Sequence, residues 1–190
     1  APSSEVAKEE STGDPDAAAA AAEVKIKGFY GIPAISHCCM EPHGQVCEWE
    51  GQDQLTAWCS TQAVSGLPGQ FADKLDIPTS NVRVITPYMG GGFGSKFSAD
   101  RWGIDCAEMA KEAQAPVKLF LERNAELAVA GDRPSAYAKI EVGAKKDGTL
   151  TYWSSESWGS GGIAGSRGSP PLPYVVEVPN RRQKHISVVT

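Results

Sequence analysis

The sequence predicts an α+β fold in which mixed sheets are combined with two or three helices. Alternating apolar and polar residues, as in VKIKGFY at 24–30, indicate half-buried strands. Apolar residues spaced three or four apart at 67–75 and 98–114 indicate amphipathic helices. The Asp147-Gly148 pair is a strong signal for a tight turn that joins two strands into a hairpin. No internal repeat is visible.

Residues 1–23 are expected to form a flexible N-terminal segment and a short helix. The opening residues are small and polar. Asp14 can cap a helix, Pro15 suits its first turn, and the alanines that follow have the highest helix propensity. Residues 24–190 are expected to form a partial domain that is truncated at the C-terminus, because the chain stops inside a predicted strand.

The remaining elements follow from the same patterns. Beyond 24–30, the predicted strands are 45–50, 55–61, 81–89, 116–123, the two arms of a hairpin at 136–157, 174–178 and 185–190. The helix at 98–114 is expected to bury a face formed by Trp102, Cys106, Met109 and Ala113.

The composition is globular and argues against a nucleic-acid binder. The chain is 41% hydrophobic, carries a net charge of −5 and has a pI of about 5.2. It has no apolar run that could span a membrane and no signal-peptide pattern at its start. Its five cysteines lack a framework spacing, which favours reduced thiols. Both the cytoplasm and the bacterial periplasm remain open as compartments.

The stretch PYMGGGFGSKF at 87–97 places a glycine-rich loop between a predicted strand and a predicted helix. Free N–H groups at such a junction favour anions. The loop does not match a Walker phosphate-binding motif, because Ser95 separates Gly94 from Lys96. It does not match a dinucleotide-binding fingerprint either, because Ser95 stands at the sixth position, where that motif needs glycine. The alternative is a tight connection with Phe93 in the core. Three adjacent glycines exceed what a turn needs, and favour close approach of a ligand to the backbone.

A second candidate site is SHCCMEPHG, which contains His37, Cys38, Cys39 and His43. Zinc ligands usually come in pairs with two to four residues between them. Adjacent cysteines in a strand would point to opposite faces and could not share one ion. Buried thiols and hydrogen-bonded histidines are therefore favoured, and no directly ligating residue is expected.

Taken together, the motifs resemble those of the molybdenum hydroxylases, the xanthine dehydrogenase and aldehyde oxidoreductase superfamily. The resemblance covers the chain from about Gly13 onward and rests on SHCCMEPHG, LTAWCSTQ, PYMGGGFGSKF, APVKLFLERNAE and AKKDGTL in register. The most specific element is GGGFGSK preceded by STQ. The resemblance implies the N-terminal part of the molybdenum-binding region in the molybdopterin-binding large subunit.

The resemblance also implies roles for individual residues. Gly91, Gly92, Phe93 and Gly94 would pack against the molybdenum end of a molybdopterin cofactor, where the backbone leaves no room for Cβ atoms. Phe93 would also form a wall of the site. Gln62 would donate a hydrogen bond to an oxo ligand of molybdenum, so Gln62 and Phe93 are the expected catalytic residues. The cofactor form, with or without a cytosine dinucleotide, is left open.

Phe97 stands where purine-oxidising members of the family carry a glutamate. With Phe93, it would line a substrate pocket suited to an aldehyde or an apolar N-heterocycle rather than a polar purine. The alternative is that Phe97 packs under the following helix.

The family chemistry implied is hydroxylation of an aldehyde or N-heterocyclic aromatic carbon with water. Electrons would leave through iron–sulfur clusters, with FAD as a further carrier. The expected partners are the rest of the molybdopterin subunit, an iron–sulfur subunit and a flavin subunit. The family's general base and its arginine-containing loop have no match before Thr190, so the fragment is expected to be inactive alone.

Three other functions remain as alternatives: a nucleotide- or phosphate-binding module that uses the glycine loop, a non-catalytic scaffold fragment, and a zinc module. Molybdenum or pterin in purified material would distinguish the leading hypothesis from tight ATP binding, and metal analysis would test the zinc module.

Overall fold

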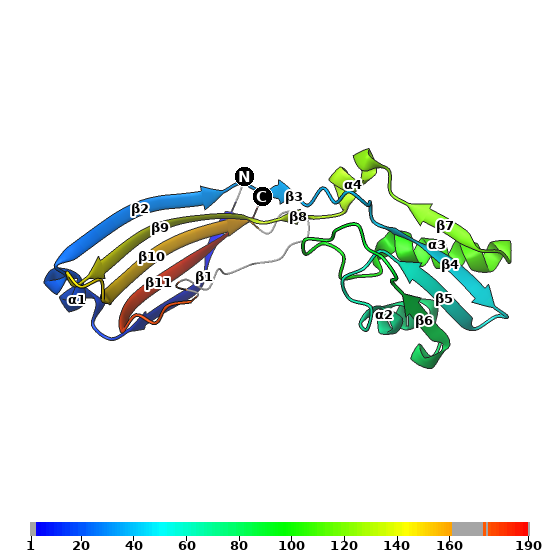
Figure 1. Ribbon diagram of the computed structural model, residues 1–190, viewed down its shortest axis with the longest axis horizontal. Coiled ribbons are helices and arrows are strands. Elements are labelled where there is room, and N and C mark those ends of the chain that lie inside the picture. Colours follow the sequence, from blue (N-terminus) through cyan, green and yellow to red (C-terminus); the bar gives the residue numbers. More distant parts are fainter. Residues whose placement is uncertain (1–2, 161–172, 174, 190) are drawn as a thin grey trace. The chain divides into compact units, whose positions relative to one another are not determined.

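The computed structural model describes residues 3–160, 173 and 175–189, which fall into two compact units (Figure 1). The first unit contains residues up to 35 together with those from 132 onward, and the second contains residues 36–131. Four α-helices and mixed sheets are present in the described part of the chain, which confirms the predicted α+β class. None of the helices described is long and apolar enough to cross a membrane.

A five-stranded sheet in the order β1-β11-β10-β9-β2 forms most of the first unit (Figure 1). Its strands are β1 (Ser3–Thr12), β2 (Val24–Ile32), β9 (Ser135–Ala144), β10 (Leu150–Ser160) and β11 (Asn180–Val189). Neighbouring strands are antiparallel except β10 and β11, which are parallel. Helix α1 (Pro15–Ala21) follows the predicted cap, since the Asp14 carboxylate accepts a hydrogen bond from the Ala17 N–H at 3.0 Å.

Residues 3–12 do not form the flexible segment that we expected. Ser3–Thr12 forms strand β1, which pairs antiparallel with β11 near the other end of the chain. Because the partner strand is so distant in sequence, local composition could not reveal the pairing. The strand predicted at 174–178 is also wrong for its described residues, because β11 begins only at Asn180, after a proline that cannot donate to a sheet ladder.

A four-stranded sheet in the order β6-β5-β4-β7 forms the centre of the second unit. Its strands are β4 (Gly44–Glu50), β5 (Gln54–Cys59), β6 (Val82–Ile85) and β7 (Val117–Phe120). The β4–β5 hairpin is antiparallel, β5 and β6 are parallel, and β7 is antiparallel to β4. The helical segments are α2 (Leu67–Leu75), the 3-10 turn η1 (Thr79–Asn81), α3 (Asp100–Ala113) and α4 (Arg123–Val129). Two short strands, β3 (Ile35–Ser36) and β8 (Asp132–Arg133), form a separate pair.

One face of the four-stranded sheet packs against α2 and α3 to form the core of this unit. Alternate residues of β5, namely Leu55, Ala57 and Cys59, point into that core, as the period of a strand requires. Phe71 of α2 is fully buried there. Burial raises the pKa of the Cys59 thiol to about 12, so this thiol is protonated at neutral pH. All five cysteines are free thiols.

The buried face of α3 is rotated from the predicted one. The structure buries Gly103, Ile104, Cys106, Ala107 and Ala110, whereas Met109 is 41% exposed. Our prediction followed the largest side chains, but the helix packs closely on β4 and β7 through its smallest ones. Helix α4 is not among the predicted helices, and within it Arg123 and Glu126 form an ion pair at 3.4 Å.

Candidate functional site

Four loops of the second unit meet at one edge of its sheet because of the strand directions. The parallel strands β5 and β6 both end there, so the residues after Cys59 and those after Ile85 are neighbours. Strand β4 runs the opposite way, so the segment before Gly44 also lies at this edge. Strand β7 ends beside the start of β4 and leads into α4.

The glycine loop follows β6 and has an unusual backbone. Gly91 and Gly94 have φ values of +95° and +101°, in the region that favours glycine. Phe93 has a φ of +52° and a 60% exposed side chain. A non-glycine residue in that conformation costs on the order of 1–2 kcal/mol, and such strain is concentrated at functional sites. Phe93 therefore projects outward from the loop. The alternative in which Phe93 packs in the core is wrong for this unit.

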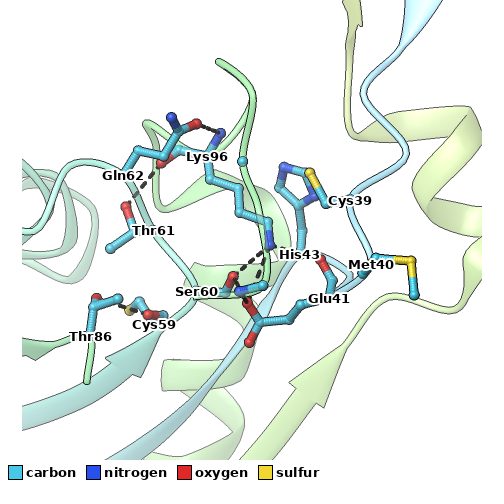
Figure 2. Close-up of polar contacts among 12 residues, drawn as sticks. Cys39, Met40, Glu41, His43, Cys59, Ser60, Thr61, Gln62, Thr86 and Lys96 are labelled. Carbon is cyan, nitrogen blue, oxygen red and sulfur yellow. Dashed lines mark hydrogen bonds and ion pairs between the residues drawn. The ribbon is translucent and has the colours of Figure 1, made fainter. Parts of the chain in front are cut away.

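Gln62 faces the glycine loop, as the sequence predicts. Its side-chain Oε1 accepts a hydrogen bond from the N–H of Gly94 at 2.9 Å. It also accepts one from the N–H of Lys96 at 3.4 Å (Figure 2). Its own backbone N–H donates to the carbonyl of Lys96 at 2.8 Å. With the carbonyl end committed to the loop, the Nε2 amide group is left as a donor with no partner among the described residues.

At Gly90 and Gly92, the space that a Cβ would need is occupied by side chains of the protein itself. A Cβ on Gly92 would overlap Oε1 of Gln62, and a Cβ on Gly90 would lie 2.5 Å from Cβ of Glu41. We expected the missing Cβ atoms to make space for a cofactor. At Gly92 the space is taken by the side chain of Gln62, so this glycine acts by letting Gln62 reach the loop.

The exposed part of the glycine loop combines hydrogen-bond donors with the apolar side chains of Phe93 and Phe97. The backbone N–H groups of Gly91 and Gly92 have no acceptor in the described part of the chain, and the Nε2 of Gln62 lies in the same region. Phe93 is exposed beside these donors, and Phe97, at the end of the loop, is 52% exposed. The ring of Phe97 is thus not buried under α3 in this unit.

Lys96 points away from this outward side. Its side chain is fully buried, and Nζ donates to the carbonyl of Glu41 at 2.8 Å and to Oγ of Ser60 at 2.6 Å (Figure 2). A phosphate-binding loop needs its lysine on the ligand side. The position of Lys96 therefore argues against the nucleotide-binding alternative.

The SHCCMEPHG segment contacts the glycine loop and helix α4 through hydrogen bonds. The buried His43 places Nε2 3.2 Å from the carbonyl of Ser95, and its backbone N–H donates to Oε2 of Glu126 at 2.7 Å. Arg123 donates to the carbonyl of Cys39 at 2.6 Å, which fixes α4 to the same segment.

The structure does not assemble these histidines and cysteines into a metal site. Cys38 and Cys39 lie in a loop rather than a strand, with Cys38 exposed and Cys39 buried. The described residues contain no group of three or more His, Cys, Asp or Glu side chains that could hold a metal ion. His37 lies at the loop, with Nε2 4.0 Å from where a Cβ on Gly94 would be.

Sequence reasoning missed the residues that support the loop, above all Glu41 and Ser60. Glu41 and Ser60 lie directly within or beside the motifs SHCCMEPHG and STQ, so their positions in the motifs were the available signal. Their roles depend on contacts across loops that are far apart in sequence, and spacing alone does not reveal such contacts.

Comparisons with known proteins agree on one family. The model of the molybdopterin cofactor-binding domain family matches residues 1–178. The aldehyde oxidoreductase molybdenum-binding subunit PaoC of Escherichia coli strain K12 is 37% identical over 157 residues, which are 83% of this chain and 21% of that protein. The nicotinate dehydrogenase large molybdopterin subunit of Eubacterium barkeri is 31% identical over 179 residues, or 90% of this chain and 41% of that protein.

Solved structures show the same fold. An aldehyde oxidoreductase from Desulfovibrio gigas superposes with a TM-score of 0.76 at 21% identity, over 100% of this chain and 21% of that one. Quinoline 2-oxidoreductase from Pseudomonas putida 86 gives a TM-score of 0.74 at 21% identity, over 97% of this chain and 25% of that one. The chain thus spans about a fifth of the length of PaoC.

Proposed function

This chain belongs to the family of molybdopterin cofactor-binding domains, and we therefore propose that it forms part of the molybdenum site of an oxidoreductase. The reaction we propose is hydroxylation of an aldehyde or N-heterocyclic aromatic carbon with water. Electrons would leave through iron–sulfur clusters on a partner, with FAD on a further domain or subunit. The similar proteins include an aldehyde oxidoreductase, a nicotinate dehydrogenase and a quinoline 2-oxidoreductase, which supports this substrate range.

The observation that carries the proposal is the fixed orientation of Gln62. The loop holds Oε1, so the amide Nε2 is left as the donor of this side chain, and Gln62 and Phe93 are both exposed. Together with the N–H groups of Gly91 and Gly92, it forms a site made of donors. Such a site fits a group that is rich in oxygen and sulfur acceptors, as the molybdenum cofactor is, in either pterin form.

Each of these residues has a distinct task in the proposed site. The cofactor, when bound, supplies the oxygen-transfer and two-electron chemistry. Gln62 would hold its N–H toward the negative charge that develops there, and a preorganised donor of this kind is worth more in a dry site than in water. Phe93 would exclude water from one side, and Phe97 would orient an apolar substrate ring. Neither phenylalanine offers a hydrogen bond to a purine.

A test is the substitution Gln62→Glu in the complete enzyme that contains this chain. Glutamate keeps an oxygen for the N–H groups of Gly94 and Lys96 but removes the outward donor. We expect kcat for benzaldehyde or quinoline to fall by roughly 10²-fold, the usual loss for one preorganised donor. Molybdenum content per subunit, measured by mass spectrometry, reports separately on cofactor retention.

The matched control is Gln54→Glu, which makes the same change at the exposed start of β5, away from the loop. It should leave kcat and molybdenum content unchanged. Wild-type turnover in the Gln62→Glu enzyme would contradict the proposed role of the amide. Tight binding of ATP without molybdenum would instead favour the phosphate-binding alternative.

A further inference from the structure

Glu41, Ser60 and Lys96 form a part-buried polar network beside the glycine loop (Figure 2). Lys96 is 1% exposed, and lysine is almost never so buried unless it is paired. Besides the carbonyl of Glu41 and Oγ of Ser60, its Nζ lies 3.5 Å from Oε2 of Glu41. The Ser60 hydroxyl in turn donates to the same Oε2 at 2.6 Å.

The Glu41 carboxylate holds the first end of the glycine loop. Its Oε2 accepts the N–H of Gly90 at 2.7 Å, and the Glu41 N–H donates to the Gly90 carbonyl at 3.1 Å. Partial burial would raise the pKa of Glu41, but hydrogen bonds from Ser60 and Gly90 and the charge of Lys96 hold it below its usual value. The carboxylate is therefore ionised at neutral pH.

The backbone of Lys96 holds the other end of the loop. Its carbonyl accepts the Gln62 N–H at 2.8 Å and the Thr61 hydroxyl at 3.0 Å, and its N–H donates to Oε1 of Gln62. The network thus fixes Gly90 through Glu41 and anchors Lys96 at both its side chain and its backbone. Gln62 is bound between these two points.

We propose that Glu41, Ser60 and Lys96 are positioning residues that set the register of the glycine loop and thereby the direction of the Gln62 amide. This inference rests on the proposed function of Gln62. An ion pair with a buried lysine adds little net stability compared with apolar residues of similar volume, so control of geometry is the role that the arrangement favours. Small displacements at such sites can cost orders of magnitude in rate.

The test uses Glu41→Gln in the complete enzyme, because glutamine keeps the shape and one acceptor while removing the charge that pairs with Lys96. We expect kcat for benzaldehyde to fall about tenfold. In a Gln62→Glu background the same substitution should cost less than about twofold, since no amide remains to be misdirected. An equal loss in both backgrounds would show a general structural role and overturn the inference.

Hydrogen exchange provides a readout that does not depend on turnover. Glu41→Gln, and the charge-neutral double variant Glu41→Gln with Lys96→Met, should speed amide exchange in a peptide that covers 87–97. The control Lys111→Met, on the exposed side of α3, should not. Unchanged exchange in both network variants would overturn the inference. If Gln62→Glu alone keeps full turnover, the proposed function fails, and hydrogen exchange still decides whether the network holds the loop.

Discussion

Glycine has two separate roles at the residue scale. Gly91 and Gly94 are needed for their positive φ, which other residues adopt only at a cost. Gly90 and Gly92 are needed because the side chains of Glu41 and Gln62 fill the space of a Cβ. The glycine triplet is therefore explained by the backbone turn and by two supporting side chains, and the outward N–H groups are what remains for a ligand.

Gly92→Ala tests this explanation at a single residue. The added Cβ would displace the flexible end of Gln62 rather than backbone, so we expect the free energy of unfolding to change by less than about 1 kcal/mol. Turnover by the complete enzyme should nevertheless fall about tenfold, because the amide loses its position.

The control is Gly69→Ala, where nothing lies within 4 Å of the added Cβ. Gly69 lies within α2, so alanine should stabilise the helix by up to about 1 kcal/mol and leave turnover unchanged. Full turnover in Gly92→Ala would show that Gln62 can shift without loss of function.

At the scale of secondary-structure elements, the order of the strands brings the residues of the site together. Strands β5 and β6 are parallel neighbours, so Gln62 and the glycine loop leave the sheet at the same edge although helix α2 separates them in sequence. Helix α3 then starts from the end of the loop and packs on β4 and β7. The packing of α2 and α3 on the sheet is therefore a condition for the site.

Phe71→Ala tests the contribution of that packing. Phe71 is fully buried between α2 and the sheet, so we expect the free energy of unfolding to fall by about 3–5 kcal/mol in urea titrations. Met109→Ala removes a large side chain that is 41% exposed on α3, and should cost less than about 1 kcal/mol. Similar costs for the two variants would contradict the observed rotation of α3.

At the scale of the whole molecule, the chain spans about a fifth of the length of PaoC. The described residues provide donors, apolar surface and the support behind them, all within the unit formed by residues 36–131. From the family resemblance, we expect the general base and further pterin-binding loops to lie outside these 190 residues. The activity we propose is thus that of a larger assembly.

The corresponding prediction concerns the isolated chain of 190 residues. Supplied with molybdenum cofactor, it should show no turnover of benzaldehyde, quinoline or xanthine above a cofactor-only blank. The complete enzyme, assayed in parallel with a dye as electron acceptor, is the positive control. Turnover by the isolated chain would refute our expectation that it is inactive alone.

Much of this protein could be predicted from local sequence. The Asp14 cap and the left-handed turn at Gly148 depend on residues close to one another in the chain, and both are present. The family motifs led to Gln62 and the glycine loop, and the family itself is confirmed by the match over residues 1–178. The roles of Phe93 and Phe97 stay predictions.

Other features were decided only by tertiary structure. The pairing of β1 with β11, the rotation of α3 and the burial of Lys96 against Glu41 all join residues that are distant in sequence. Propensity and spacing describe how a segment folds locally, whereas a buried charge or a strand pair depends on which partner the fold supplies. The sequence alone determined the local conformations and the family, and the tertiary structure decided which side chains meet, because such contacts depend on packing across the whole unit.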